Sequence, residues 1–378
     1  MLANGMEVSF KKMRKYKKTE NLCEAEVLYK VPYYKFCVKT GVEVKMSEQA
    51  RYIFSKGGLS RKDFSIQFRG DRGINYIPIA DTRELYCFED ITISTKLLNL
   101  LANSGVLIHF FDYFGHYTGT FYPKNHLVSG SLTIKQCKAF TEDRMVIAKA
   151  FVSGIAANIY FLMYHYYRHG KKELKEYIDW LRADIPKLLG KQINIKQLLM
   201  IEGTIWARFY QTFKVFLPED FVLNKRVKRP PDNPINALIS FGNSLLYAKT
   251  LTQIYHTHLD PAISFLHEPG ESRFSLSLDL CEVFKPAVVY KTIFDCVNNR
   301  KLNVSKHFSK ELNYCILNEQ GRKIFIKAFE DRMNQVFNHP VLKRKVSYKT
   351  AVKLDAYKLI KFITEGKEFS AFNMEACK

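Results

Sequence analysis

The chain has 378 residues, 47% of them hydrophobic and 25% charged, so it is long enough for two ordinary domains and is neither disordered nor fibrous. Its 58 lysines and arginines against 37 aspartates and glutamates give a net charge of +21, which indicates a polyanionic partner such as nucleic acid. No stretch approaches ~20 uninterrupted apolar residues and the N-terminus has no apolar signal core, which disfavours membrane-spanning and secreted proteins.

The eight cysteines are scattered, and no two of them form a C-x-x-C pair. Such cysteines are typical of reduced thiols in a cytoplasmic protein, whereas a zinc ribbon requires paired ones. We therefore expect a cytoplasmic protein with no membrane partner.

Residues 1–45 show little periodicity and carry a lysine-rich cluster between Lys11 and Lys18. This charge run predicts a weakly structured basic extension, and a solvated tail without a role is the simpler interpretation. Met46 could be an alternative start, because the ordered pattern begins just after it.

The second zone, residues 46–132, is dominated by short apolar runs separated by turn residues. Residues 52–54, 65–68 and 76–79 are such runs, with glycine and aspartate between them. The pattern predicts antiparallel strands with tight connections. Leucines at helical spacing within 92–104 predict one helix, so we expect a small β-rich domain that carries a single helix.

From 133 to 378, apolar residues recur three and four positions apart, which predicts a large all-helical domain. The predicted fold class is therefore α+β, with a small N-terminal β-rich domain before a large helical one. The predicted helices are residues 140–168, 171–189, 194–216, 235–258, 278–297, 308–316, 320–337 and 348–364.

Glu202 is an acid inside the apolar helical run 198–203, with Gly203 beside it. A buried acid is costly unless it is paired or bound to a cation, and a glycine lets a ligand or another backbone come close. Taken alone, Glu202 fits a solvent-facing helix edge better than a ligand.

A second group of polar residues follows the apolar pair Phe265-Leu266. His267 precedes a Glu-Pro-Gly turn, and Asp279 and Glu282 lie three residues apart, on one face of a predicted helix. Two acids and a histidine supply ligands that suit Mn²⁺ or Mg²⁺. A core histidine followed by a helix with an acidic first turn explains them equally well, and spacing alone does not join them to Glu202.

Four basic residues precede Pro230, namely Lys225, Arg226, Lys228 and Arg229. Cations on a rigid loop suit phosphate contacts. One such cluster is more often a solvated face, but a net charge of +21 favours an extended DNA-binding track.

His165 and His169 have the i,i+4 spacing of a zinc pair, but no glutamate stands where an H-E-x-x-H protease requires one. We therefore discount them as a metal site, and interpret Tyr164, Tyr166 and Tyr167 as residues of a packing face or an interface. The sequence has no Gly-rich phosphate loop of either common type, which disfavours an ATP-driven enzyme.

Several long motifs resemble the CRISPR-associated integrase family, the first Cas protein, which inserts new spacers into a CRISPR array. The resemblance runs from about Tyr52 to the C-terminus. The motifs are residues 91–98, Glu202-Gly203, and residues 228–242, 244–247, 259–263, 265–270 and 278–286.

This resemblance implies a β-rich dimerisation domain over 46–132, a helical catalytic domain over 133–378, and a homodimer. In that family a glutamate, a histidine and a later acid bind one divalent cation, which places Glu202, His267 and Glu282 as ligands of Mg²⁺ or Mn²⁺. Asp279 matches a second acid near the metal, and Tyr247 matches an active-site tyrosine. The expected partners are double-stranded and branched DNA and a small ferredoxin-like second Cas protein.

Two functions remain open at this point. The first is a metal-dependent DNA integrase and endonuclease in which a 3′-hydroxyl attacks a repeat phosphodiester and which also nicks branched DNA. The second is a non-catalytic basic scaffold that binds DNA. The presence of Glu202, His267 and Glu282 favours the first, because a pure binding surface needs no acids near phosphate.

Overall fold

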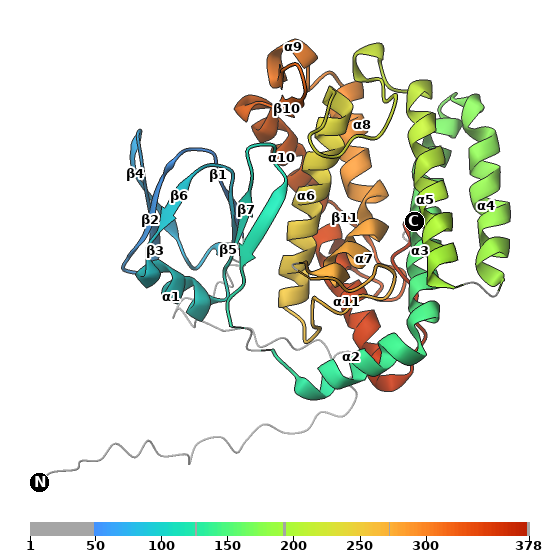
Figure 1. The fold of residues 1–378 in the computed structure, drawn as a ribbon, viewed down its shortest axis with the longest axis horizontal. Helices are drawn as coiled ribbons and strands as arrows, with labels where there is room; N and C mark the ends of the chain where they lie inside the picture. The colour runs from blue at the N-terminus through green and yellow to red at the C-terminus, as the bar shows by residue number, and fades with distance from the viewer. Residues whose placement is uncertain (1–48, 125–126, 192–193, 272, 376–378) are drawn as a thin grey trace, which may run out of the picture. The chain divides into compact units, whose positions relative to one another are not determined.

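The computed structural model describes residues 49–124, 127–191, 194–271 and 273–375, which belong to one compact unit spanning Ser47–Lys378. Strands dominate its N-terminal part and helices the remainder, so the predicted α+β class is confirmed (Figure 1). The predicted extension 1–45 and Met46 lie outside the described residues, and the domain boundary at 132 stays a prediction.

Two four-stranded sheets form the N-terminal part. Their strands are β1 (Gln49–Ile53), β2 (Gly57–Lys62), β3 (Ser65–Gly70), β4 (Gly73–Pro78), β5 (Thr82–Cys87), β6 (Ile91–Ile93), β7 (Leu107–Phe111) and β8 (Tyr117–Phe121). One sheet has the order β4-β3-β2-β6, and the other has the order β1-β5-β7-β8.

The prediction of antiparallel strands is only partly right. Strands β2, β3 and β4 form an antiparallel meander, and β7 and β8 pair antiparallel. The pairs β1–β5, β5–β7 and β2–β6 are parallel. Parallel neighbours need a crossover through other elements, and turn residues between adjacent apolar runs do not reveal one.

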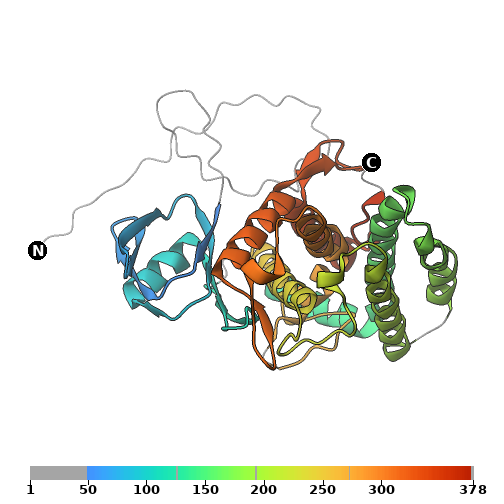
Figure 2. The same ribbon diagram turned by 90° about the horizontal axis from the view of Figure 1, so that it is seen from above.

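Helix α1 (Thr95–Ser104) completes the N-terminal part. It begins after the N-cap Ser94 rather than at Thr92, because residues Ile91–Ile93 pair with β2. Leu97 and Leu101 are fully buried in a core that the strands and α1 share, and Figure 2 shows α1, in teal, among the blue strands.

The C-terminal part is built mainly from helices. They are α2 (Gly130–Glu142), α3 (Arg144–Arg168), α4 (Lys175–Gly190), α5 (Ile195–Gln211), α6 (Pro234–Tyr255), α7 (Ser275–Phe284), α8 (Lys291–Asn298), α9 (Val304–His307), α10 (Glu319–Asn334) and α11 (Tyr348–Glu365). A π-helical turn, η5 (Pro286–Tyr290), joins α7 to α8.

One predicted helix, residues 308–316, is wrong. This segment forms an antiparallel hairpin of β9 (Phe308–Lys310) and β10 (Cys315–Leu317). The backbone N–H of Glu311 donates to the carbonyl of Tyr314 at 2.8 Å and closes the turn. Nine residues are too few for apolar spacing to separate a helix from two short strands. A second short hairpin joins α10 to α11 through β11 (Val336–Asn338) and β12 (Lys345–Ser347).

Helices α3 and α6 contribute more residues to the large core than the other helices do. Helix α6 is apolar on all sides, and nearly all of its residues are buried. Helix α3 is long and apolar enough to cross a membrane, but most of its apolar window is buried against other helices, as in a core helix of a folded protein.

A buried ion cluster joins the strands to the helices. The Nζ of Lys249, in α6, lies 2.5 Å from Oε1 of Glu84 in β5 and 2.7 Å from Oε1 of Glu330 in α10. Tyr86 donates to Oε2 of Glu84 at 2.9 Å, and Tyr52 donates to Glu330. Lys249 and Glu84 are almost completely buried, so each charge is compensated within the cluster.

The cluster also fixes protonation states. Burial would raise the pKa of Glu84, but Lys249, Lys349 and His109 outweigh burial and lower this pKa to about 2. Burial lowers the pKa of His109 to about 4, so its ring is neutral at pH 7. Its two nitrogens lie 2.8 Å from the hydroxyls of Thr120 and Thr252, which joins β7 and β8 to α6.

We predict that Lys249→Met lowers the free energy of unfolding by about 3–5 kcal/mol, because Glu84 and Glu330 then lose their buried cation. Urea unfolding monitored by circular dichroism measures this change. The matched control is Lys138→Met, whose ion pair with Glu142 is 68% and 58% exposed and should contribute at most ~1 kcal/mol. Similar losses of unfolding free energy in the two variants would show that the buried cluster stabilises the fold no more than an exposed ion pair does.

Candidate active site

Helix α5 positions Glu202. The helix begins with a capping box between Asn194 and Gln197, and Leu198 and Ile205 bury one face in the core. Glu202 is partly buried on this helix. No other backbone of the described residues approaches Gly203, which is exposed and where an added Cβ meets no atom within 4 Å; the approach of a ligand stays a prediction.

The carboxyl group of Glu202 lies in an unfavourable environment for a charge. Burial raises its pKa to about 7, and the Glu282 carboxylate contributes in the same direction. His267 and Lys285 lower the pKa but do not offset these effects. Glu202 therefore interacts electrostatically with both of the other predicted ligands, although they are more than 60 residues away in sequence.

Asp279, in α7, holds the loop that carries His267. Its fully buried carboxylate accepts from the backbone N–H groups of Phe265 at 2.6 Å, Leu266 at 2.8 Å and His267 at 3.0 Å. Its Oδ1 also lies 2.8 Å from Nδ1 of His267. All four of these contacts of the Asp279 carboxylate are with the loop of residues 265–267, so Asp279 positions this loop.

The bond from Asp279 orients the His267 ring. Burial lowers the pKa of His267, but the hydrogen bond and charge of Asp279, with Glu282 and Glu202, raise it overall. A carboxylate that accepts from Nδ1–H leaves Nε2 as the nitrogen with a free lone pair. The side chain is 23% exposed, so the ring lies at the surface of the loop.

Glu282 lies one helical turn after Asp279 and is only 8% exposed. Its Oε1 accepts from Nζ of Lys285, which lies three residues further along. Its Oε2 is buried and has no hydrogen-bond partner. Burial would lower the pKa of Lys285, but Glu282 more than offsets this effect and raises it.

The predicted ligands fit a divalent cation in their chemistry, because two carboxylates and an imidazole suit Mn²⁺ or Mg²⁺. The orphaned Oε2 of Glu282 and the raised pKa of Glu202 both indicate negative charge that lacks compensation. Among the described residues, however, no three His, Cys, Asp or Glu side chains form a ready metal-binding group. The set Glu202, His267 and Glu282 therefore stays a prediction.

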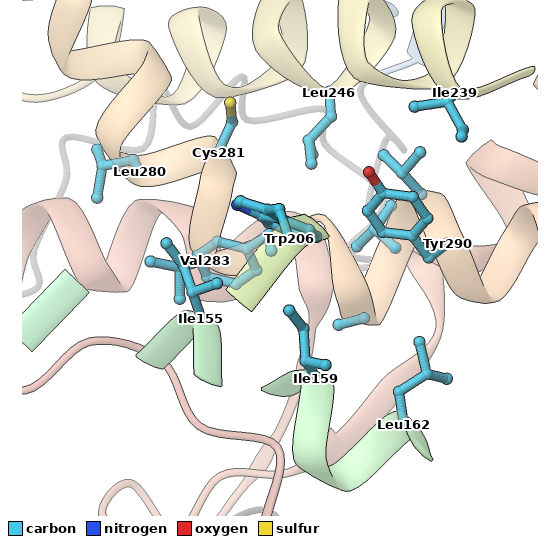
Figure 3. Packing of buried hydrophobic residues seen from close by; sticks show 14 of the residues in the cluster. Ile155, Ile159, Leu162, Trp206, Ile239, Leu246, Leu280, Cys281, Val283 and Tyr290 are labelled. Carbon is cyan, nitrogen blue, oxygen red and sulfur yellow. The ribbon is translucent and has the colours of Figure 1, made fainter. Parts of the chain in front are cut away.

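Buried apolar residues fix the helices behind these side chains. Figure 3 shows Trp206 of α5 close to Val283 and Cys281 of α7, with Ile155 and Ile159 of α3 below them. Dense packing of this kind transmits small shifts, so the distance between α5 and α7 is set by the core rather than by the polar groups.

Tyr247 of α6 is buried and bonded to the segment before α7. Its hydroxyl accepts from the backbone N–H of Phe274 at 3.1 Å and lies 3.3 Å from the Phe274 carbonyl. Burial raises its pKa. The Tyr247 ring meets Tyr117 of β8 edge to face at 4.8 Å. Its predicted catalytic role stays untested, and its observed contacts fix the start of α7.

Sequence reasoning missed two residues that brace the His267 loop. Gln136 of α2 is fully buried and donates to the carbonyls of Asp260 and Ile263 at 3.0 Å. Arg144 of α3 donates to the Phe265 carbonyl at 2.9 Å and pairs with Glu268 at 2.5 Å, on either side of His267. No local motif marks such long-range contacts.

Sequence reasoning also missed Lys285, for which a signal existed. Its i,i+3 spacing from Glu282 predicts an ion pair on one helix face.

The predicted DNA-binding residues differ in orientation. Lys225, Lys228 and Arg229 are exposed. The guanidinium of Arg226 instead donates to Oδ1 of Asn236 at 3.0 Å and to the hydroxyl of Ser240 at 2.9 Å. Its N–H groups are therefore used in hydrogen bonds within the protein.

Comparison with known proteins gives a consistent result. The family model described as CRISPR associated protein Cas1 matches residues 51–331. A CRISPR-associated protein Cas1 from Methanobrevibacter ruminantium is 41% identical over 86% of this chain and 99% of its own length. A CRISPR-associated endonuclease Cas1 from Fusobacterium nucleatum is 39% identical over 90% of this chain and 99% of its own. A solved Cas1 structure from Thermotoga maritima, 34% identical, has a TM-score of 0.76 and covers 86% of this chain and 99% of that one.

We predict that Glu202→Gln stabilises the metal-free protein at pH 8 by about 1–3 kcal/mol. The folded pKa of about 7 lies above the ordinary value of 4.5, so the stability that Glu202 contributes is full below pH 4.5 and is lost as the pH rises through 7. Urea unfolding with a chelator at pH 8 and pH 4.5 measures the difference. The gain should vanish at pH 4.5, and Glu176→Gln, at a 90% exposed side chain, is the control. An equal gain at both pH values would contradict the prediction.

Proposed function

The chain belongs to the Cas1 family of CRISPR-associated proteins, and from this membership we propose that it is a divalent-metal-dependent DNA endonuclease and integrase that inserts spacer DNA into a CRISPR array. Its curated relatives include proteins named CRISPR-associated endonuclease Cas1 at 39% identity. The observation that carries the metal-dependent chemistry is the electrostatic coupling of Glu202 to Glu282 and His267 across two helices and a loop.

Glu202, His267 and Glu282 would hold Mg²⁺ or Mn²⁺. When bound, the cation supplies positive charge that stabilises the phosphoryl group and the attacking or leaving oxygen. Asp279 keeps the Nδ1 proton of His267 in place, so Nε2 remains available. In the metal-free chain the pKa of Glu202 is about 7, so binding of a cation would release its proton.

The proposed joining reaction conserves phosphodiester bonds. The 3′-hydroxyl of the incoming DNA forms a bond to a repeat phosphorus, and the repeat strand leaves with a 3′-hydroxyl of its own. In the nicking of branched DNA, water takes the place of the attacking hydroxyl. The exposed Lys225, Lys228 and Arg229 would contact DNA phosphates.

We further propose that the chain acts as a homodimer together with a small ferredoxin-like second Cas protein. Strand β4 lies at the edge of its sheet, with Ile74 45% exposed and Tyr76 56% exposed. An edge strand with exposed apolar side chains needs a cover, and a second copy in a symmetric dimer supplies one.

We predict that Glu202→Ala and His267→Ala each abolish Mn²⁺-dependent cleavage of branched DNA and strand transfer, because each removes a cation ligand. The measurement is gel analysis of labelled substrates with and without Mn²⁺. Unchanged circular dichroism shows that the fold is retained, and Glu142→Ala, an exposed acid of α2, is the control. Wild-type strand transfer by Glu202→Ala would contradict the ligand assignment, whereas a wild type that binds DNA but neither cleaves nor joins it would favour the basic scaffold.

The exposed basic loop should govern the salt dependence of DNA binding. We predict that removing Lys228 and Arg229 together makes the log–log salt slope for duplex DNA shallower by about 2, at ~0.9 per phosphate contact. Fluorescence anisotropy over a range of salt concentrations measures the slope. Removal of Lys135 and Lys138, which lie on α2, is the control of equal charge. An unchanged slope would show that the loop is a solvated connection.

The third prediction concerns assembly. The wild type should have the mass of a dimer by light scattering at micromolar concentration. The double variant Ile74→Glu/Tyr76→Glu should be monomeric, because charges on the covered edge of β4 repel. Phe64→Glu is the control, because Phe64 is an apolar residue with 76% exposure that lies outside β4. A monomeric wild type would count against the proposed dimer.

A further inference from the structure

A cavity of about 430 Å³ lies away from the predicted ligands. It is formed by the last turns of α3, the starts of α8 and α11, the end of α10 and Met374. None of Glu202, His267, Asp279 and Glu282 lines it. Its volume is in the range of small-molecule sites.

Five basic side chains from three different helices line this cavity. They are His165, Arg168, His169, Lys291 and Arg332. The rings of His165 and His169 lie 4.3 Å apart. Lys291 pairs with Asp295, and the same carboxylate also acts on the charges of Arg332 and His165. Among the described residues, the basic side chains of the cavity therefore share this one acid.

Arg332 is the decisive residue of the cavity. Its guanidinium is partly buried and donates only to neutral acceptors, the Ala287 carbonyl at 2.7 Å, the Tyr348 hydroxyl at 3.1 Å and Gln335. Within the described ranges it forms no ion pair with a carboxylate. The acid that acts on its charge is Asp295, which already pairs with Lys291. A phosphate would supply the compensation that one shared carboxylate does not, because a half-buried guanidinium is poorly solvated by water.

The rest of the cavity lining consists of three aromatic residues together with Leu162 and Met374. The aromatic residues are Phe161, Tyr164 and Tyr348, and the Arg332 guanidinium stacks on the Tyr348 ring at 4.5 Å. Aromatic faces interleaved with cations are typical of sites that stack a nucleobase and bind its phosphate.

The helix dipole does not explain this set of charges. Basic residues in the last turn of α3 complement its negative end, which accounts for His165 and Arg168. It does not account for Lys291 and Arg332, which belong to α8 and α10.

We propose that this cavity binds a nucleoside phosphate, with the phosphate on Arg168, Lys291 and Arg332 and the base against the aromatic wall. The proposal does not rest on the function proposed above. The ligand is either a free nucleotide or an unpaired nucleotide of a DNA strand, since both present the same base and phosphate.

The test uses the full chain in a chelator and a fluorescent N-methylanthraniloyl-AMP as probe. We expect saturable binding that AMP displaces and adenosine does not, because the phosphate is required. Arg168→Gln should weaken binding at least about tenfold, since it removes a charge-assisted contact from an exposed residue that the fold does not need. Lys135→Gln removes the same charge outside the cavity and should leave the affinity unchanged.

Two more variants make the test specific. Arg332→Lys keeps the charge but loses the planar fork, so binding should weaken while circular dichroism stays unchanged. Glu202→Ala should bind the probe as the wild type does. Displacement by a single-stranded oligonucleotide, but not by blunt duplex, would assign the ligand to a DNA strand, and displacement by AMP alone would assign it to a free nucleotide.

Three results would overturn the proposal. The first is no saturable binding by the wild type. The second is an affinity that neither Arg168→Gln nor Arg332→Lys changes. The third is displacement by decanoate but not by AMP, which would make the cavity a site for an acyl chain.

Discussion

The Asp279 carboxylate is the interaction on which the candidate active site depends. It accepts three backbone N–H groups of the 265–267 loop and contacts Nδ1 of His267, all from a position without solvent exposure. Hydrogen bonds to a charged group contribute about 1.5–3 kcal/mol each. Because Glu282 follows one turn later on the same helix, a single carboxylate fixes His267 relative to Glu282. Gln136 and Arg144 support the same loop from its outer side.

The molecule contains two groups in which two acids lie near one lysine, but the acids are compensated to different degrees. Around Lys249, each acid has a cation or a hydroxyl partner, and the pKa of Glu84 falls to about 2. Around Glu202, two acids share one lysine, the pKa of Glu202 rises to about 7, and Oε2 of Glu282 has no partner. The first group stabilises the fold as it stands. The second group has the arrangement that is expected of a site that binds a positively charged ligand.

Periodicity predicted most helices because a buried face repeats every three to four residues, as in α6 and α11. It failed for residues 308–316, where nine residues form a hairpin, and it could not reveal the parallel pairs of β5, which join strands distant in sequence. The motifs identified Asp279, but only the fold shows that its oxygens are occupied by backbone N–H groups. Residues such as Arg144 act through contacts over 120 residues apart, which a single sequence does not contain.

The ion cluster around Lys249 also restricts how this sequence can change. Its three charges come from β5, α6 and α10, so they are encoded far apart in the gene. Replacement of Lys249 alone by an apolar residue leaves Glu84 as an uncompensated buried charge, whereas joint replacement by well-packed apolar residues can be neutral. Glu84 and Lys249 should therefore change together among related sequences, and an engineered chimera that exchanges the strand-rich part alone should take Lys249 from the same parent as Glu84.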